Sequence, residues 1–563
     1  MRRLRLPLLA VASGLLTALA LPLAVPYGSL REVDPAGHLE LLAWVGLVPA
    51  LVALIGARRT RGAAALGLLA GFTYFWVAIW WVSHAMTAFG GLPAVAALPA
   101  LALLVLYMAG HWALLFAVAH RIRARLGWPL HLHLPPAWAA AELLRNYLFS
   151  GFPWADLGYT QVRTLPVAQL AAVTGVYGVA ALVAAVNAAL AEAWVARRAG
   201  GGWRWRPVAA VGALVALVVA GGTWHLRGVR AAMAAAPSVR VGVVQPNVDQ
   251  STKNAARENA AYILGRLVPP TLEADRRGAD LVAWPEAAYP LYVPPGITSF
   301  DDPEAGLPRL ARAHLLMGVA TLERLRGDGG ELHYRVGNEQ FLLTPELERL
   351  GSYRKHHLVP FGEYVPSIVK TLLPFVDKVV PSVAAVAPGS ELRVLAFTPR
   401  PGAATPAALA PAEPVRLAPL ICFDAIFPEV ARAFAAQQPA PDLLVNATND
   451  AWYGYSSGPY QFLAIVRMRA IETGRAVIRP AYAGVSAVIL PTGELAPGWL
   501  EVGPVDPDLA PRLDEPPGLL VTDVPRLQGR TLYTRLGDLF AWACVAATLA
   551  ALGLALRRRR PAA

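Results

Sequence analysis

Three polar residues in the second half of the chain have the side chains that acyl transfer through a thiol requires. Cys422 follows the apolar run 415–421, Glu286 follows the apolar run 280–284, and Lys355 lies in a polar stretch between them. A carboxylate can take the thiol proton as a general base. An ammonium favours the thiolate and stabilises the oxyanion formed when the thiolate attacks a carbonyl. Glu, Lys and Cys together are therefore sufficient for acyl transfer through a thioester.

Each of these residues, taken alone, is more often structural. A lone cysteine is usually a small buried hydrophobe, and a lone Glu or Lys is usually solvated surface. His356 and His357, beside Lys355, also permit a Cys–His pair, but adjacent histidines in a polar loop are more often structural. Cys544 lies in a late apolar segment, so a disulfide with Cys422 is not expected.

The elements around these residues predict an α/β domain. Short apolar runs alternate there with helix-like stretches. The expected strands lie within 238–247, 280–284, 315–321, 338–343, 415–421, 442–446 and 485–491, and the expected helices at 253–268 and 459–475. Pro269 and Pro270 are expected to interrupt the first helix. Such alternation indicates a substantial sheet, with Glu286 and Cys422 where a strand meets a loop.

The rest of the chain is apolar enough to cross a membrane. It is 56% hydrophobic and 16% charged, whereas an ordinary soluble protein is about 25% charged. The candidate spans are approximately 6–25, 40–57, 63–83, 92–120, 135–149, 166–196, 207–224 and 535–556. A helix needs about 20 apolar residues to cross the bilayer core, so about eight spans are expected. The span 135–149 is short and contains Glu142 and Arg145, which could pair on one helical face.

Arginine clusters mark every second loop. They are Arg2, Arg3 and Arg5; Arg58, Arg59 and Arg61; Arg121, Arg123 and Arg125; Arg197, Arg198, Arg204 and Arg206; and Arg557 to Arg560. Positive flanks stay cytoplasmic, so both termini are expected inside and the α/β domain outside. The predicted organisation is a membrane domain at 1–224, an outer catalytic domain at 225–530, and a final membrane helix with a basic tail at 531–563.

Charge and composition exclude some other functions. The net charge of +12 does not indicate nucleic acid, because much of the arginine lies in short clusters beside apolar segments rather than on long basic faces. No zinc-ligand spacing is present, and His131 and His133 in a Pro-containing linker are interpreted as structural. No metal and no cofactor are expected.

The chain resembles the bacterial apolipoprotein N-acyltransferases, whose outer domain belongs to the nitrilase superfamily. The resemblance covers nearly the whole chain. It is carried by Trp284 to Glu286, Lys355 with Leu358 to Pro366, Leu420 to Asp424, Asn449 to Gly454, Ser457 to Pro459, Arg467 to Glu472, and Gly151 to Trp154 with Gly158, Tyr159 and Gln161. The resemblance implies an αββα sandwich with the catalytic triad Glu286, Lys355 and Cys422. Glu363 resembles a second functional glutamate, which supports the lysine and the intermediate. Phe423, Asp424 and Trp452 are the other supporting positions that the resemblance implies.

Some positions differ from the family pattern. Phe423 replaces a frequent Tyr, Asp424 a common Glu, Asn254 a frequent Trp, and Phe462 a common His. Phe423 has no hydroxyl to offer as a hydrogen bond, and Asp424 reaches less far than Glu. These differences concern the details of substrate recognition and leave the triad intact.

The resemblance implies a two-step reaction in the bacterial inner membrane. Cys422 attacks the sn-1 ester of a phospholipid, giving a thioester and a lysophospholipid. The α-amine of an S-diacylglyceryl cysteine at the N-terminus of an apolipoprotein then takes the acyl chain. Glu286 takes the thiol proton and assists the amine, and Lys355 stabilises the oxyanion. The implied partners are the phospholipid, the apolipoprotein and the bilayer, and a monomer is expected.

Two alternatives use the same features. A membrane-tethered nitrilase-type amidase would use the same triad on a soluble amide, but a mere anchor needs one span. A transporter with an accessory outer domain would need ionisable residues in its spans. The first four spans carry almost none, and Glu142 and Arg145 are the clearest candidates.

Overall fold

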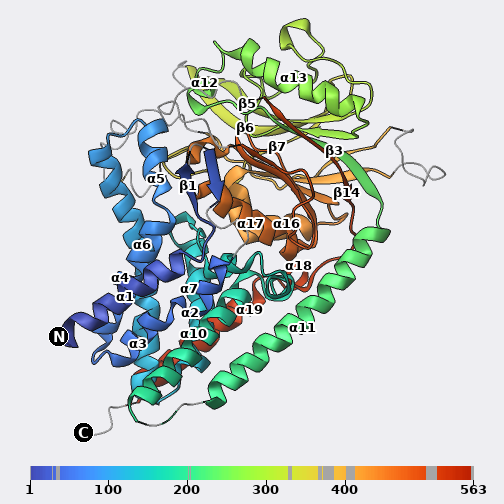
Figure 1. Ribbon diagram of the computed structural model, residues 1–563. Helices are drawn as coiled ribbons and strands as arrows, with labels where there is room; N and C mark the ends of the chain where they lie inside the picture. The colour runs from blue at the N-terminus through green and yellow to red at the C-terminus, as the bar shows by residue number, and fades with distance from the viewer. Residues whose placement is uncertain are drawn as a thin grey trace.

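The computed structural model describes residues 2–27, 29–32, 38–200, 202, 205–326, 332–365, 371, 386–400, 413–454, 456–502 and 516–558. Arg204, Pro366, Arg559 and Arg560, which belong to the predicted clusters and motifs, lie outside these residues. A helical bundle and an α/β domain pack against one another (Figure 1).

Long helical segments form the bundle. They are α1 (Arg2–Ala18), the stretch Leu39–Gly56 with α2 (Ala43–Gly46) and α3 (Val48–Gly56), α4 (Thr60–Ala78), α6 (Ala94–Leu126), α7 (Leu130–Tyr147), α10 (Val176–Arg198), α11 (Trp205–Ala235) and α19 (Leu539–Arg557). Within the described residues, 6 helices are long and apolar enough to cross a membrane. The predicted spans 6–25 and 135–149 correspond to α1 and α7, which are not among these 6.

The prediction of one helix across 166–196 is wrong. The segment divides into α8 (Leu165–Ala168), α9 (Ala171–Thr174) and α10. Gly175 between α9 and α10 has φ +67°, and a Cβ there would lie 2.7 Å from the ring of Tyr533. A left-handed residue cannot continue a right-handed helix, so α10 starts afresh at this position.

The predicted pairing of Glu142 with Arg145 is replaced in the structure by separate contacts of the two side chains. Arg145 forms its ion pair with Asp156, in the loop that follows α7. Glu142 accepts from the indole of Trp138 at 2.9 Å and from the backbone N–H of Leu157 at 2.8 Å. Both side chains therefore fasten this loop onto α7, where burial makes an unpartnered charge costly.

Some helix ends of the bundle face the α/β domain, and others lie away from it. Arg125 at the end of α6 donates to the carbonyl of Arg558 at the end of α19, at 3.0 Å. At the opposite ends, Trp81 in α5 (Trp81–His84) and Val176 at the start of α10 contact the α/β domain. The arginine-flanked ends of α6 and α19 thus lie away from the α/β domain, consistent with the predicted alternation of loops (Figure 1).

Two six-stranded sheets form the α/β domain, in the orders β14-β3-β4-β5-β6-β7 and β13-β12-β11-β10-β9-β8. The first contains β3 (Ser238–Gln245), β4 (Leu281–Ala283), β5 (His314–Arg326), β6 (Leu332–Leu343), β7 (Arg349–Arg354) and β14 (Gly518–Pro525). The second contains β8 (Leu395–Phe397), β9 (Val415–Ile421), β10 (Leu443–Ala447), β11 (Ala476–Arg479), β12 (Gly484–Ile489) and β13 (Leu500–Val502). The predicted strands are all present.

One predicted helix differs in extent. α13 (Ala260–Arg276) begins later than expected and continues through Pro269 and Pro270. Each proline removes one helical hydrogen bond, but Ile263 and Leu267 are fully buried in the core beneath the helix. Tertiary packing of this apolar face offsets the missing bonds.

Aliphatic side chains from both sheets form the core between them, among them Val241, Leu316, Leu417 and Leu443. α13 packs on the first sheet. On the second sheet pack α16 (Pro428–Ala435) and α17 (Gly458–Thr473), whose buried residues share one core with the bundle. The predicted αββα sandwich on a helical membrane domain is thus confirmed. It brings the segments after β9 and β10 close to the bundle (Figure 1).

Candidate active site

Glu286 lies in a turn that rests on β5. The backbone N–H of Trp284 donates to Leu316 at 2.8 Å and that of Tyr289 donates to Gly318 at 3.0 Å. A Cβ on Gly318 would lie 2.1 Å from the carbonyl oxygen of Pro285, so only glycine lets the turn approach so closely. The backbone of β5 therefore determines where the Glu286 carboxylate points.

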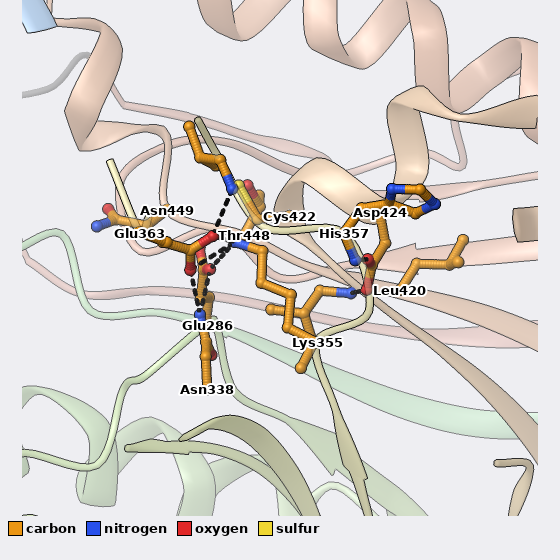
Figure 2. A network of polar contacts seen from close by, with 12 residues as sticks. Glu286, Asn338, Lys355, His357, Glu363, Leu420, Cys422, Asp424, Thr448 and Asn449 are labelled. Atoms are coloured by element: carbon orange, nitrogen blue, oxygen red, sulfur yellow. Dashed lines mark hydrogen bonds and ion pairs between the residues drawn. The ribbon is translucent and has the colours of Figure 1, made fainter. Parts of the chain in front are cut away.

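The Lys355 ammonium, one residue after β7, lies between two carboxylates. It donates to Glu286 Oε1 at 2.9 Å and to Glu363 at 3.0 Å (Figure 2). Burial disfavours the charge of Lys355, but Glu286 and Glu363 hold its pKa well above the usual value. Burial likewise opposes ionisation of Glu286, yet Lys355 and Lys253 keep the pKa of Glu286 below its usual value. Lys355 and Glu286 are consequently both ionised at neutral pH.

Asn338 on β6 joins the two carboxylates. Its amide donates to Glu286 at 2.8 Å and to Glu363 at 3.2 Å. The backbone carbonyl of Asn338 accepts from the backbone N–H of Lys355 at 2.9 Å. Sequence reasoning placed Asn338 in a strand but missed this role. The signal was available in the polar run 337–340, which is unusual inside a buried strand.

Cys422 is the first residue of the short helix η6 (Cys422–Ile426), directly after β9. Its φ is +47°, a strained value for a residue with a Cβ. The amide of Asn446 donates to the Cys422 carbonyl at 3.2 Å and stabilises this backbone. The structure thus brings Cys422 to the Lys355 group, beside Thr448 (Figure 2).

The Cys422 thiol is protonated in the resting site. Burial and the Glu286 carboxylate raise its pKa to about 12, against opposing effects of Lys355 and of a hydrogen bond with Thr448. A thiol in this state needs a base before it can attack. Among the carboxylates that act on the thiol, Glu286 has the largest effect, so it is the best candidate for this base.

Asp424 links the segment of the nucleophile to the segment of the lysine. Its carboxylate accepts from the backbone N–H groups of Ile421 at 3.0 Å and His357 at 2.6 Å, and from the Tyr353 hydroxyl at 2.9 Å. Burial raises the pKa of Asp424 to about 6, although these donors and Lys355 lower it. Although Asp is shorter than the Glu common in the family, its carboxylate reaches both segments, because the backbone N–H groups of Ile421 and His357 lie within hydrogen-bond distance of it.

Phe423 belongs to an aromatic cluster at the boundary with the bundle. Its ring stacks on Phe152, from the loop after α7, with 6.3 Å between ring centroids. Trp154 follows in that loop, with 5.6 Å between the centroids of its ring and that of Phe462 of α17. Gln461 Oε1 accepts from the indoles of Trp154 at 2.8 Å and Trp81 at 3.3 Å. Sequence reasoning did not assign this role to Gln461.

Trp452, predicted as a supporting residue, lies on the short helix η7 (Asp450–Tyr453) after β10 and is half-buried. Its neighbour Tyr453 contacts the bundle, with 4.7 Å between the centroids of its ring and that of Trp81. Tyr453 is therefore a member of the aromatic cluster that the sequence did not single out.

The histidines have structural contacts. His356 bonds the carbonyl of Gly389 at 2.9 Å, and the ring of His357 stacks on Phe427 at 4.1 Å. His131 pairs with Glu192 at 2.6 Å, and His133 bonds the carbonyl of Pro129 at 2.9 Å. Across the described residues, no group of three or more His, Cys, Asp or Glu could hold a metal ion.

Known proteins resemble both parts of the chain. Residues 13–189 match the family described as the apolipoprotein N-acyltransferase N-terminal domain, and residues 231–505 match the carbon–nitrogen hydrolase family. An amidase of Nesterenkonia sp. AN1 is a structural relative at 22% identity and a TM-score of 0.32, covering 53% of this chain and 95% of that one.

Two relatives are similar to this chain over nearly its whole length. A protein of Geobacter metallireducens named apolipoprotein N-acyltransferase is 33% identical over 99% of this chain and 98% of its own length. One of the same name from Brucella suis is 32% identical over 93% of this chain and 97% of its own length. On this similarity, the chain belongs to the apolipoprotein N-acyltransferase family.

Proposed function

We propose that this acyltransferase moves an acyl chain from a membrane phospholipid, through a thioester on Cys422, to the α-amine of an S-diacylglyceryl cysteine. The acceptor is the N-terminus of an apolipoprotein, so the reaction completes lipoprotein maturation. The observation that carries the proposal is the Lys355 ammonium held between Glu286 and Glu363 beside Cys422. This arrangement lies where the α/β domain packs on apolar helices.

In the first step, Glu286 takes the proton of the Cys422 thiol and the sulfur attacks the sn-1 ester carbonyl. Lys355 stabilises the tetrahedral oxyanion, together with backbone N–H groups after the nucleophile. The C–O bond then breaks, and the lysophospholipid alkoxide takes the proton from Glu286. The products are a thioester on Cys422 and a lysophospholipid.

In the second step, the α-amine of the apolipoprotein attacks the thioester and passes a proton to Glu286. The C–S bond breaks, and the Cys422 thiolate recovers a proton from Glu286. Glu363 and Asn338 support the ionised Lys355 in both steps through their hydrogen bonds. Asp424, Phe423 and Trp452 act as supporting residues around the nucleophile.

The two parts of the chain divide this work in the proposal. Residues 1–224 and 531–563 hold the enzyme, as a monomer, among its lipid substrates in the bacterial inner membrane. Residues 225–530 carry out the chemistry on the periplasmic face, with both termini in the cytoplasm. Both substrates are anchored in the bilayer, so tethering the site at the interface replaces a three-dimensional search by a lateral one.

An acyl-enzyme assay tests the proposal. Purified protein is mixed with a phospholipid carrying a labelled sn-1 chain. We expect label on the protein that neutral hydroxylamine releases and that Cys422→Ala lacks. Adding a diacylglyceryl-cysteine peptide should discharge the label onto the peptide amine. A protein that is active but never labelled would contradict the thioester.

A nitrilase-type amidase is the second candidate, favoured by the match of residues 231–505 to carbon–nitrogen hydrolases. The same assay separates the two functions. Discharge of the label to water, with no transfer to the peptide amine, would support the amidase.

A further inference from the structure

A second lysine, Lys253, contacts the main chain of Glu286. It belongs to the short helix α12 (Gln250–Asn254) after β3. Its ammonium donates to the backbone carbonyl of Glu286 at 2.9 Å and lies 3.9 Å from the centroid of the Tyr482 ring. The Glu286 turn is thus in contact with both Gly318 of β5 and Lys253.

α12 is fastened so that Lys253 has a defined position. The Asp249 carboxylate caps the helix by accepting from the backbone N–H of Thr252 at 2.9 Å. Gln250 accepts from Asn449 at 2.7 Å, in the segment that also carries Thr448 beside Cys422. Asn254 accepts from Gln250 at 2.8 Å, which gives the residue that replaces the family's Trp a role in the same network.

The charges of the site need a second cation. Glu286 and Glu363 are two carboxylates that share the single ammonium of Lys355, which leaves one negative charge unbalanced in a buried site. Lys253 supplies the missing positive charge. Its own pKa is lowered to about 8 by burial and by Lys355, against the attraction of Glu286 and Cys422. In turn Lys253 helps to keep the pKa of Glu286 below its usual value.

We infer that Lys253 is a positioning residue of the acyl-transfer site, which acts through Glu286 by fixing its main chain and balancing the second carboxylate. Glu286 is thereby kept ionised and ready to take the thiol proton. The inference rests on the proposed function, because it assumes that Glu286 is the base. Among the described residues, the charged and titratable groups around Glu286 and Lys253 include Lys355 after β7, Glu363, Cys422 of η6, Tyr453 of η7 and Tyr482 before β12.

The test measures how fast iodoacetamide alkylates Cys422 in the full-length purified enzyme between pH 3 and 9. The rate is read from the Cys422 peptide, so Cys544 does not interfere. Lys253→Gln keeps a donor for the Glu286 carbonyl but removes the charge. We expect Lys253→Gln to slow alkylation by about tenfold at acidic pH, where Glu286 is partly protonated. The acid limb of the pH profile, where the alkylation rate falls as Glu286 is protonated, should lie about one pH unit higher in Lys253→Gln than in the wild type. The reason is that Glu286 loses a cation that favours its ionised form.

Two variants serve as controls. Lys253→Arg keeps the charge and should leave the acid limb where it is in the wild type. Arg257→Met removes a positive charge at an exposed position shortly after α12 and should leave both rate and limb unchanged. A Lys253→Gln enzyme with the wild-type rate and limb would overturn the inference, as would a Lys253→Arg enzyme that is shifted as far as Lys253→Gln.

Glu286→Gln distinguishes failure of this inference from failure of the proposed function. If Glu286 is the base, Glu286→Gln slows alkylation by at least about a hundredfold. Slow Glu286→Gln with unaffected Lys253→Gln overturns only the role of Lys253. An unaffected Glu286→Gln overturns the proposed base and the inference together.

Discussion

The ring of Phe423 stacks on the ring of Phe152, with 25° between their planes. Phe423 directly follows the nucleophile, and Phe152 lies in the loop after α7 that Arg145 and Asp156 fasten to the bundle. The residue beside Cys422 therefore packs on the membrane domain itself. Phe423 has no hydroxyl to donate a hydrogen bond, and its ring instead makes an apolar contact between the two domains.

Phe423→Ala should weaken that contact. Phe423 is buried, and truncating a buried Phe costs about 3–5 kcal/mol of stability. We expect a lower melting temperature and at least about tenfold slower acylation from phospholipid, since the packing at the nucleophile loosens. Phe423→Tyr keeps the ring and is the matched control. Acylation by Phe423→Ala at the wild-type rate would show that the stack does not matter to the reaction.

Gln461 holds two indoles at the domain boundary. Gln461→Leu leaves the N–H groups of Trp81 and Trp154 without their acceptor, and each unsatisfied buried donor costs about 1–3 kcal/mol. We expect lower stability and slower acylation from phospholipid. Gln461→Glu retains an acceptor oxygen and should come closer to the wild type. The comparison fails if Leu and Glu give the same melting temperature and the same rate.

Gly318→Ala should displace the carboxylate of Glu286, the proposed general base. The new Cβ would overlap the Pro285 carbonyl, so the turn that carries Glu286 must move. A displacement of about 1 Å can reduce the rate by about a hundredfold. Gly265→Ala is the control, because nothing lies within 4 Å of the Cβ position there and alanine favours a helix. Acylation rates of the two variants decide the matter, and equal rates would contradict a tight contact at Gly318.

Asp424 should make activity and stability depend on pH in opposite directions. Its pKa of about 6 in the folded protein exceeds the value of about 3.9 in an unfolded chain. Folding therefore favours the protonated form: this stabilising contribution is complete below pH ~3.9 and is lost as the pH rises through ~6. The ionised form, however, is the one that accepts from all three donors around it.

We accordingly expect acylation to slow as the pH falls below about 6, because a protonated Asp424 gives up part of its capacity to accept. The free energy of unfolding of the wild type, relative to Asp424→Asn, should rise over the same range. Denaturant titrations of both proteins at pH 7 and pH 5 check the second expectation. A difference between the two proteins that is independent of pH would refute the assigned shift.

The sequence allowed most of the fold to be predicted, because strands and amphipathic helices follow from local patterns of apolar residues. The strand 415–421 is present with the predicted bounds, and the helix predicted at 459–475 is present as Gly458–Thr473. Errors occurred where distant packing decides. α13 continues through Pro269 and Pro270 because its apolar face is buried, and the predicted helix 166–196 is interrupted where Gly175 meets Tyr533.

By itself, the sequence determined which residue types were available for thiol chemistry and which segments were apolar enough for a membrane. Only the tertiary structure decided which of them meet: Lys355 and Glu286 are 69 residues apart, and Trp81 and Gln461 are 380 apart. The roles of Asn338, Lys253 and Gln461 depend on such contacts. Local patterns report the burial and periodicity of one segment, whereas hydrogen bonds between distant segments form only once the two sheets and the bundle have packed together.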